Sequence, residues 1–116
     1  MTIAAVVTHH GVGVLVTWAA LDEIEQDGEP FEMPDGQDRC IQFIGTVGAT
    51  GSIQMEGSND GSNWHILTDP QGNAIVKTAL DMEQVTEFTR YVRPYVTAGE
   101  VDVTDFDALL YVRRQR

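Results

Sequence analysis

The amino-acid sequence predicts an all-β protein, a single antiparallel β-sandwich or jelly roll with seven or eight short strands and little helix. Short apolar segments alternate with polar residues and are rich in β-branched side chains, which gives the two-residue period of a strand. Glycine, proline, asparagine and aspartate separate these segments, as turns require. With 116 residues, of which 42% are hydrophobic, residues 1–116 are expected to form one domain.

The clearest strand pattern lies near the N-terminus. In residues 12–18, valines recur at every second position and Trp18 continues their phase. Residues 2–7 form a shorter apolar run. This run predicts either an added strand or part of an N-terminal arm, residues 1–10, that reaches a neighbouring molecule.

Residues 22–38 have the composition of an acidic loop, because they contain eight acids, no lysine or arginine, and several glycines and prolines. Phe31 and Met33 alternate within this loop and predict a short edge strand, a position that tolerates proline. Residues 39–47 predict the next strand. Cys40 begins its apolar run and is expected to be a small buried residue rather than a nucleophile.

The middle of the chain predicts two hairpins. The glycines around residues 49–51 favour a hairpin after the preceding strand. Residues 53–56 alternate between inward and outward positions. The Asn-Asp-Gly sequence at residues 59–61 predicts a tight turn into another strand, on which Trp64 and Ile66 are expected to face the core.

The C-terminal part predicts three more strands. Residues 74–79 form a moderate strand, whereas residues 80–89 are too short for a secure helix and predict a loop with at most one helical turn. Residues 91–97 form the next strand, in which Pro94 argues for an edge position or a bulge. Residues 101–112 form the last strand, and a change of phase near its start predicts a bulge or a short turn.

The charge of the chain excludes several kinds of partner. The net charge of −11 and the pI of 4.3 argue against binding to nucleic acid or to an anionic membrane, since both need a basic surface. Basic residues gather instead at the C-terminus, as Arg113, Arg114 and Arg116. Residues 22–38 are therefore either a solvated loop or a segment that pairs with this basic tail, within one subunit or between neighbours.

No motif for catalysis, metal binding or cofactor binding is present, so we predict no enzyme activity, no metal and no cofactor. His9 and His10 are adjacent, and in a strand their side chains point to opposite faces rather than to one metal. Residues 59–61 partly match a calcium loop but lack the EF-hand spacing, which favours the turn. The first residues lack the basic region of a signal peptide, and no stretch approaches the length of a membrane helix, so we expect synthesis in a bacterial cytoplasm.

Two resemblances add to this interpretation. Residues 53–61 (IQMEGSNDG) with Trp64, and residues 90–93 (RYVR), resemble discoidin-like jelly-roll domains, in which such segments form a hairpin and a return strand. Over the whole chain, residues 11–18 (GVGVLVTW), 57–61 (GSNDG), 69–73 (DPQGN) and 91–94 (YVRP) resemble, in this order, small structural proteins of tailed bacteriophages.

The second resemblance implies a virion component of the capsid decoration (cement) type. Such a protein binds the outer surface of the head, contacts neighbouring subunits of the major capsid protein, and often forms a homotrimer. It needs a rigid β core with exposed edges or arms and has no catalytic residue. The residues expected to contact partners are Ile3, Val6, Phe31, Met33, Arg113, Arg114 and Arg116.

An alternative function is a carbohydrate-binding module on a phage tail or baseplate. Solvent-exposed aromatic side chains would favour it, and the candidates are Trp18, Tyr91 and Tyr95.

Overall fold

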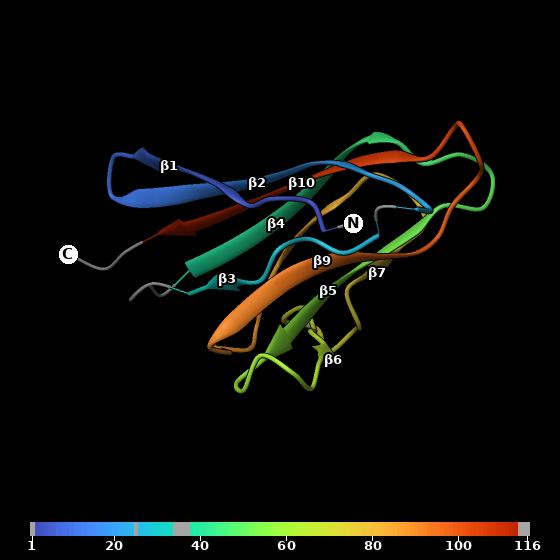
Figure 1. Ribbon diagram of the computed structural model, residues 1–116. Helices are drawn as coiled ribbons and strands as arrows, with labels where there is room; N and C mark the ends of the chain where they lie inside the picture. The colour runs from blue at the N-terminus through green and yellow to red at the C-terminus, as the bar shows by residue number, and fades with distance from the viewer. Residues whose placement is uncertain (1, 25, 34–37, 114–116) are drawn as a thin grey trace.

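The computed structural model describes residues 2–24, 26–33 and 38–113, and within them ten strands form two sheets that pack face to face (Figure 1). These residues contain no helix. The predicted all-β sandwich is confirmed. There are more strands than the predicted seven or eight because four of them have only two or three residues, too few to show a period in the sequence.

The first sheet has the order β1-β2-β10-β4-β8, with every neighbouring pair antiparallel. Its strands are β1 (Val6–His10), β2 (Gly13–Leu21), β10 (Asp105–Arg113), β4 (Asp38–Thr46) and β8 (Met82–Gln84). The strands predicted at residues 12–18 and 39–47 are thus present as β2 and β4. The N-terminal run adds a strand to its own chain, because β1 forms a hairpin with β2, and Ile3 makes a bridge to Gly28.

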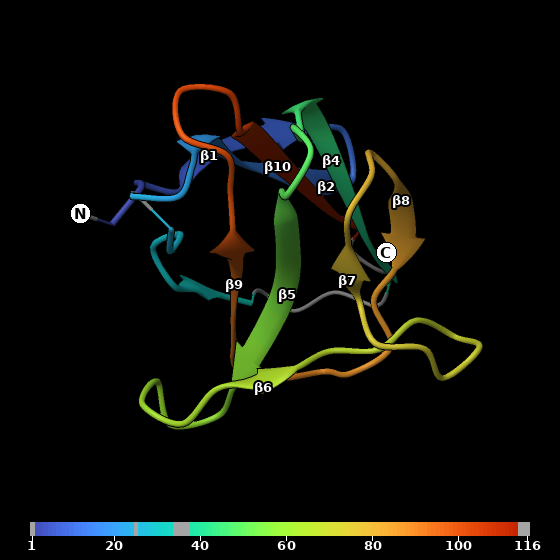
Figure 2. The same ribbon diagram turned by 90° about the vertical axis from the view of Figure 1, so that its right-hand side faces the viewer.

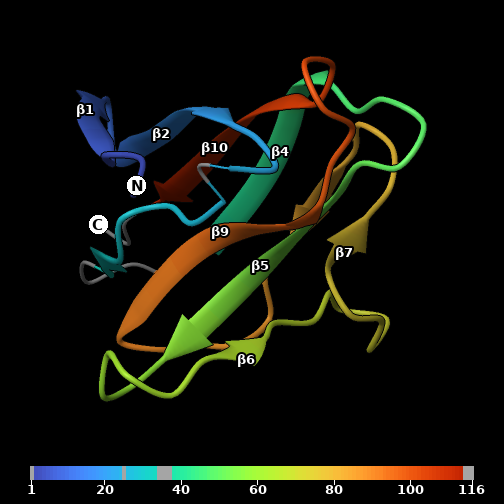
Figure 3. The same cartoon turned by 45° about the vertical axis from the view of Figure 1, so that its right-hand side comes forward.

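The second sheet has the order β3-β9-β5-β6, and β7 also pairs with β5. Its strands are β3 (Phe31–Glu32), β9 (Tyr91–Ala98), β5 (Ser52–Ser58), β6 (His65–Ile66) and β7 (Val76–Lys77). The predicted edge strand around Phe31 is confirmed. Figure 3 shows β9 beside β5 across the front of this sheet.

Pro94 lies on β9, which is not the edge strand that the sequence predicted. The proline is tolerated because β3 pairs only with Tyr91 and Val92, so this flank of Pro94 carries no regular ladder. The carbonyl of Pro94 accepts a hydrogen bond from Gly28 N–H at 3.0 Å.

The core lies between the two sheets and is built from alternate residues of the long strands. Trp18 is fully buried, and its indole Nε1 donates a hydrogen bond to the carbonyl of Glu29 at 2.9 Å. Gly28 packs against this ring, since a Cβ there would lie 2.7 Å from a Trp18 carbon. Trp18 therefore cannot be the exposed aromatic that a sugar-binding face needs.

The glycine-rich segment after β4 is a crossover between sheets, and the predicted hairpin at residues 49–51 is wrong. β4 pairs with β10 and β8, whereas β5 pairs with β9, β6 and β7. Gly45 and Gly48 have φ values of +109° and +79°, which let the chain turn away from the first sheet. Glycine spacing alone does not distinguish this path from a hairpin.

The strand after the 59–61 turn has a different phase from the predicted one. β5 and β6 do form a hairpin, but Ile66 is 43% exposed and Trp64 is half-buried on the outer side of the sheet. Leu67 fills the core position instead and donates its N–H to Met55 O at 2.9 Å. With only two paired residues, β6 is too short to hold the alternation that the sequence suggested.

Two further segments differ from expectation. Residues 82–84 form the edge strand β8, where the sequence predicted a loop with at most one helical turn. Cys40 is half-buried on the outer side of β4, and not in the core, because Arg39 and Ile41 occupy the inward positions. Near the C-terminus, the predicted short turn is present at residues 101–103, and β10 follows it.

Candidate interaction surfaces

The described residues hold no constellation suited to catalysis or metal binding. No three His, Cys, Asp or Glu side chains among them are placed to share a metal ion. His9 and His10 pair with Val14 and Gly13, and the alternation of β1 puts their side chains on opposite faces. The described part of the chain also contains no helix that is long and apolar enough to cross a membrane.

The Asn-Asp-Gly segment at residues 59–61 is a turn held by its own side chains. The Asp60 carboxylate accepts hydrogen bonds from the backbone N–H groups of Asn63 and Ser62, at 2.9 and 2.8 Å, and from the Asn63 amide and the Ser58 hydroxyl. These bonds, the one from the Asn63 backbone foremost, hold the pKa of Asp60 well below its usual value. Because the Asp60 side chain hydrogen-bonds the backbone that follows it, the predicted turn is confirmed.

One end of the sandwich, here called the loop end, consists of residues 22–24, 47–51 and 99–104. Figure 1 shows these loops together, opposite the β1–β2 hairpin, and Figure 2 views the molecule from this end. Three aliphatic side chains project there: Ile24 is 73% exposed, Val101 69% and Val103 42%. They are called the apolar tips.

The loop end is braced by hydrogen bonds around Thr104, which is itself buried. The Thr104 hydroxyl donates to Val47 O and accepts from Glu100 N–H, both at 2.7 Å. The Glu100 carboxylate accepts from Ala49 N–H at 2.9 Å, and the N–H of Val103 returns to Glu100 O at 3.0 Å. Residues 47–49 and 100–104 therefore present Val101 and Val103 on a fixed frame.

Acidic side chains surround the apolar tips. Glu23, Glu100 and Asp102 belong to the same loops, and the five ion pairs found among the described residues involve none of them. Asp102 has a φ of +61°, a left-handed conformation that aspartate adopts more readily than most residues. The loop end is thus an apolar patch in an acidic setting.

The outer face of the first sheet is a second unusual surface. The strand register places the outward side chains in cross-strand rows: Val6, Thr17, Leu109, Gln42 and Met82 form one, and Thr8, Leu15, Tyr111, Cys40 and Gln84 form the next. Both rows are uncharged. Burial, followed by the nearby carboxylate of Glu83, raises the pKa of the Cys40 thiol, which keeps the thiol protonated.

The outer face of the second sheet is polar and internally paired. The Arg93 guanidinium lies 4.2 Å from the centre of the Trp64 ring and 5.4 Å from that of Tyr95. Its Nε also donates to Glu56 at 2.9 Å. This arginine is held in place by stacking and by charge, and the two rings form a small aromatic surface around it.

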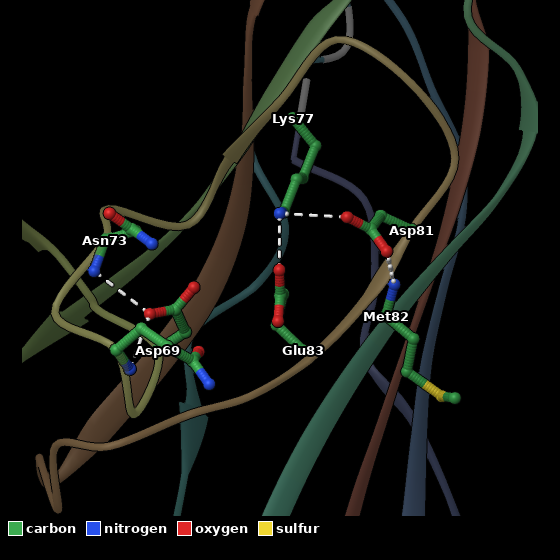
Figure 4. Close-up of polar contacts among 7 residues, drawn as sticks. Asp69, Asn73, Lys77, Asp81, Met82 and Glu83 are labelled. Carbon is green, nitrogen blue, oxygen red and sulfur yellow. Dashed lines mark hydrogen bonds and ion pairs between the residues drawn. The ribbon is translucent and has the colours of Figure 1, made fainter.

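Ion pairs close the open side of the sandwich between β7 and β8 (Figure 4). Lys77 Nζ lies 2.6 Å from the Glu83 carboxylate and 2.9 Å from that of Asp81. These hydrogen bonds, first that to Glu83, raise the pKa of Lys77. They join a strand of the second sheet to an edge strand of the first.

The residues predicted to contact partners lie in different places. Ile3, Phe31 and Met33 are half-buried and pack against the core of their own chain. Val6 is 57% exposed on β1. Arg113 pairs with Asp38 within the same chain, which supports the predicted pairing of acidic loop and basic tail. Arg114 and Arg116, which were also predicted to contact partners, lie outside the described residues.

Sequence reasoning missed the apolar tips and the outer face of the first sheet. Val101 and Val103 alternate, and the alternation was interpreted as part of a strand. The sequence does contain a signal for the outer face. Leu15 and Leu109 stand at the outward positions of strands whose inward positions are already apolar.

Comparisons with known proteins show a similar fold only. No protein-family model and no curated protein matches the sequence. The SPBc2 prophage-derived protein YomS is similar in structure, with a TM-score of 0.53 and 12% identity over 90% of this chain and 97% of that one. Protein NMB1881 from Neisseria meningitidis gives a TM-score of 0.43 and 10% identity, over 94% of this chain and 82% of that one. At 12% identity, the likeness to YomS shows that the two chains share a fold.

Proposed function

We propose that this protein is a bacteriophage capsid decoration (cement) protein that binds the outer surface of the head and bridges neighbouring subunits of the major capsid protein. In this role it acts without catalysis, metal or cofactor, on the surface of the virion, after synthesis in the host cytoplasm. The observation that carries the proposal is the loop end, where three aliphatic side chains are exposed in the same loops as the acidic residues Glu23, Glu100 and Asp102. The fold shared with a prophage-derived protein is consistent with a phage origin.

The loop end fits a partner surface with an apolar depression and basic surroundings. Fully burying an aliphatic side chain contributes about 1.5–3 kcal/mol, so covering Ile24 and Val101 contributes on the order of 3 kcal/mol. The acids beside them favour encounter with a basic surface and disfavour an acidic one. A single contact of this size is weak, and a decoration protein gains its strength from the many equivalent sites of a capsid and from the copies bound there.

The test uses purified protein and undecorated heads. We expect saturable binding and a higher temperature of head disruption. The double substitution Ile24→Ser with Val101→Ser removes the two most exposed tips and should weaken binding about 100-fold, which corresponds to roughly 3 kcal/mol. Val76→Ser is the matched control, because Val76 is 39% exposed on β7 and belongs to none of the loops of the loop end. The proposal would be refuted if heads did not bind the wild type, or if they bound the Ile24→Ser/Val101→Ser protein as tightly as the wild type.

A second candidate function is carbohydrate binding by the outer face of the second sheet. Trp64 and Tyr95 flank Arg93 there, and aromatic rings beside polar groups are suited to sugars. Glycan-array binding that Trp64→Ala abolishes, together with no binding to heads, would favour this alternative. Of the exposed aromatics expected from the sequence, Tyr91 and Tyr95 are half-buried on this face and Trp18 is not on it.

A further inference from the structure

We propose that the outer face of the first sheet is the contact between two copies of this chain, which pack face to face about a two-fold axis. This face differs from the loop end and does not depend on what the loop end binds.

The face is richer in apolar side chains than the solvated face of a sheet needs to be. An antiparallel sheet with one face in water normally alternates between apolar inward and polar outward residues. Here the outward positions of β1, β2, β10, β4 and β8 include many apolar, aromatic or thiol side chains among polar ones such as Thr8, Thr17, Gln42 and Gln84: Val6, Leu15, Ala19, Leu109, Tyr111, Cys40, Ile44 and Met82. Exposed apolar patches that extend over several strands mark interaction sites in soluble proteins.

The centre of the face is also firmly built. Tyr111 lies across Gly13, where a Cβ would come within 2.3 Å of the ring, and its hydroxyl donates to His10 O at 3.0 Å. The ring is therefore held down on the sheet. A side chain that is already fixed loses little freedom on contact with a second copy.

The two central rows of the face carry no charged side chain, which favours contact with a second copy there. Two chains with a net charge of −11 repel each other, and contact is least unfavourable where charge is low. Asp38 pairs with Arg113, and Asp107 accepts a hydrogen bond from Ala20 N–H at 2.9 Å. Asp105, on the same outward phase, lies at the margin beside the loop end.

The area is sufficient for a dimer. At roughly 3.3 Å per residue and roughly 4.8 Å between strands, the three nine-residue strands cover about 430 Å², and β1 and β8 extend the face to about 550 Å². Two copies would bury about 1,100 Å², above the roughly 1,000 Å² expected of a specific interface. Because the same face of each copy forms the contact, the dimer has two-fold symmetry.

Sedimentation velocity from about 1 to 100 µM tests the inference. We expect the wild type to reach twice the 12.8 kDa chain mass as concentration rises. Leu109→Glu puts a like charge at the centre of both faces and should weaken the dimer at least about 100-fold. Met82→Glu, at a 57% exposed position on β8, should weaken it about tenfold and decides the matter if Leu109→Glu disturbs the fold.

Two controls separate this face from the loop end. Val76→Glu places the same charge outside the face and should leave the dimer intact, as should the Ile24→Ser/Val101→Ser protein. Cys40 gives a second measurement, because dimerisation should slow its alkylation and Leu109→Glu should restore the monomer rate. A wild type that stays monomeric at about 100 µM, or an oligomer that Leu109→Glu and Met82→Glu leave unchanged, would overturn the inference.

Discussion

Thr104 gives the sharpest test of whether the loop end is preorganised. Its hydroxyl connects two loops, through a hydrogen bond donated to Val47 O and one accepted from Glu100 N–H. Thr104→Val keeps the shape of the side chain and removes both bonds. Thr104→Ser keeps the hydroxyl and serves as the matched control.

The size of the effect follows from these two contacts. Each lost hydrogen bond costs about 1 kcal/mol, and a buried group left unpaired costs about 1–3 kcal/mol. Because Glu100 is half-buried, water can reach its N–H in part, and the total becomes about 3 kcal/mol. At about 4 °C per kcal/mol for a domain of this size, the melting temperature should fall by about 12 °C if the loops open only on global unfolding.

Hydrogen exchange distinguishes local opening from global destabilisation. The N–H groups of Ala49 and Val103 are bonded to Glu100, so both should exchange about 100-fold faster in Thr104→Val at neutral pH, as 3 kcal/mol implies. Binding to heads should weaken in parallel, because loose loops must be ordered on contact. If Thr104→Val melts within about 2 °C of wild type and both amides exchange at wild-type rates, Thr104 does not brace the loop end.

Two further predictions concern stability. Arg39 is buried with its guanidinium 3.9 Å from the centre of the Phe88 ring, and burial lowers the pKa of Arg39. Arg39→Met removes this buried charge and should raise the free energy of unfolding, measured by urea titration, by about 1 kcal/mol. A free energy of unfolding that falls by more than about 1 kcal/mol would show that the contact with the ring outweighs the cost of desolvation. The pKa of Asp60 is lower in the folded than in the unfolded chain, so its stabilising contribution is present above pH about 4 and is lost as the pH falls towards the folded value. Asp60→Asn should therefore lower the melting temperature at pH 7 and narrow its difference from wild type below pH about 3; a constant difference would contradict the assignment.

The long strands were predictable because both period and residue type agree in them. In β2, Val14, Val16 and Trp18 recur at every second position; Ile41 and Phe43 share one phase in β4, and Val92 and Val96 share one phase in β9. Burial of alternate residues then follows, as for Ile41 and Phe43. Strands of two or three residues have no such redundancy, and their pairing depends on contacts with distant segments.

The candidate surfaces were harder to predict because exposure is a property of the assembled fold. Val101 and Val103 would be ordinary strand residues in another context, and only the turn at residues 101–103 places them at a tip. The opposite charges of the acidic loop and the basic tail predicted that ion pairs could form between them, as Arg113 and Asp38 do. Its position depends on β10 lying beside β4, a register that the sequence does not display.

The two proposed contacts can form at the same time, because the outer face of the first sheet and the loop end lie on different sides of the sandwich (Figures 1 and 2). A second copy on the sheet face leaves the apolar tips of both chains uncovered. A dimer then carries two loop ends, and binding of the first raises the effective concentration of the second at any neighbouring site it can reach. Leu109→Glu should therefore weaken attachment to a head more than attachment to a single isolated capsid subunit. Ile24→Ser with Val101→Ser should weaken both equally, which distinguishes loss of avidity from loss of the contact itself.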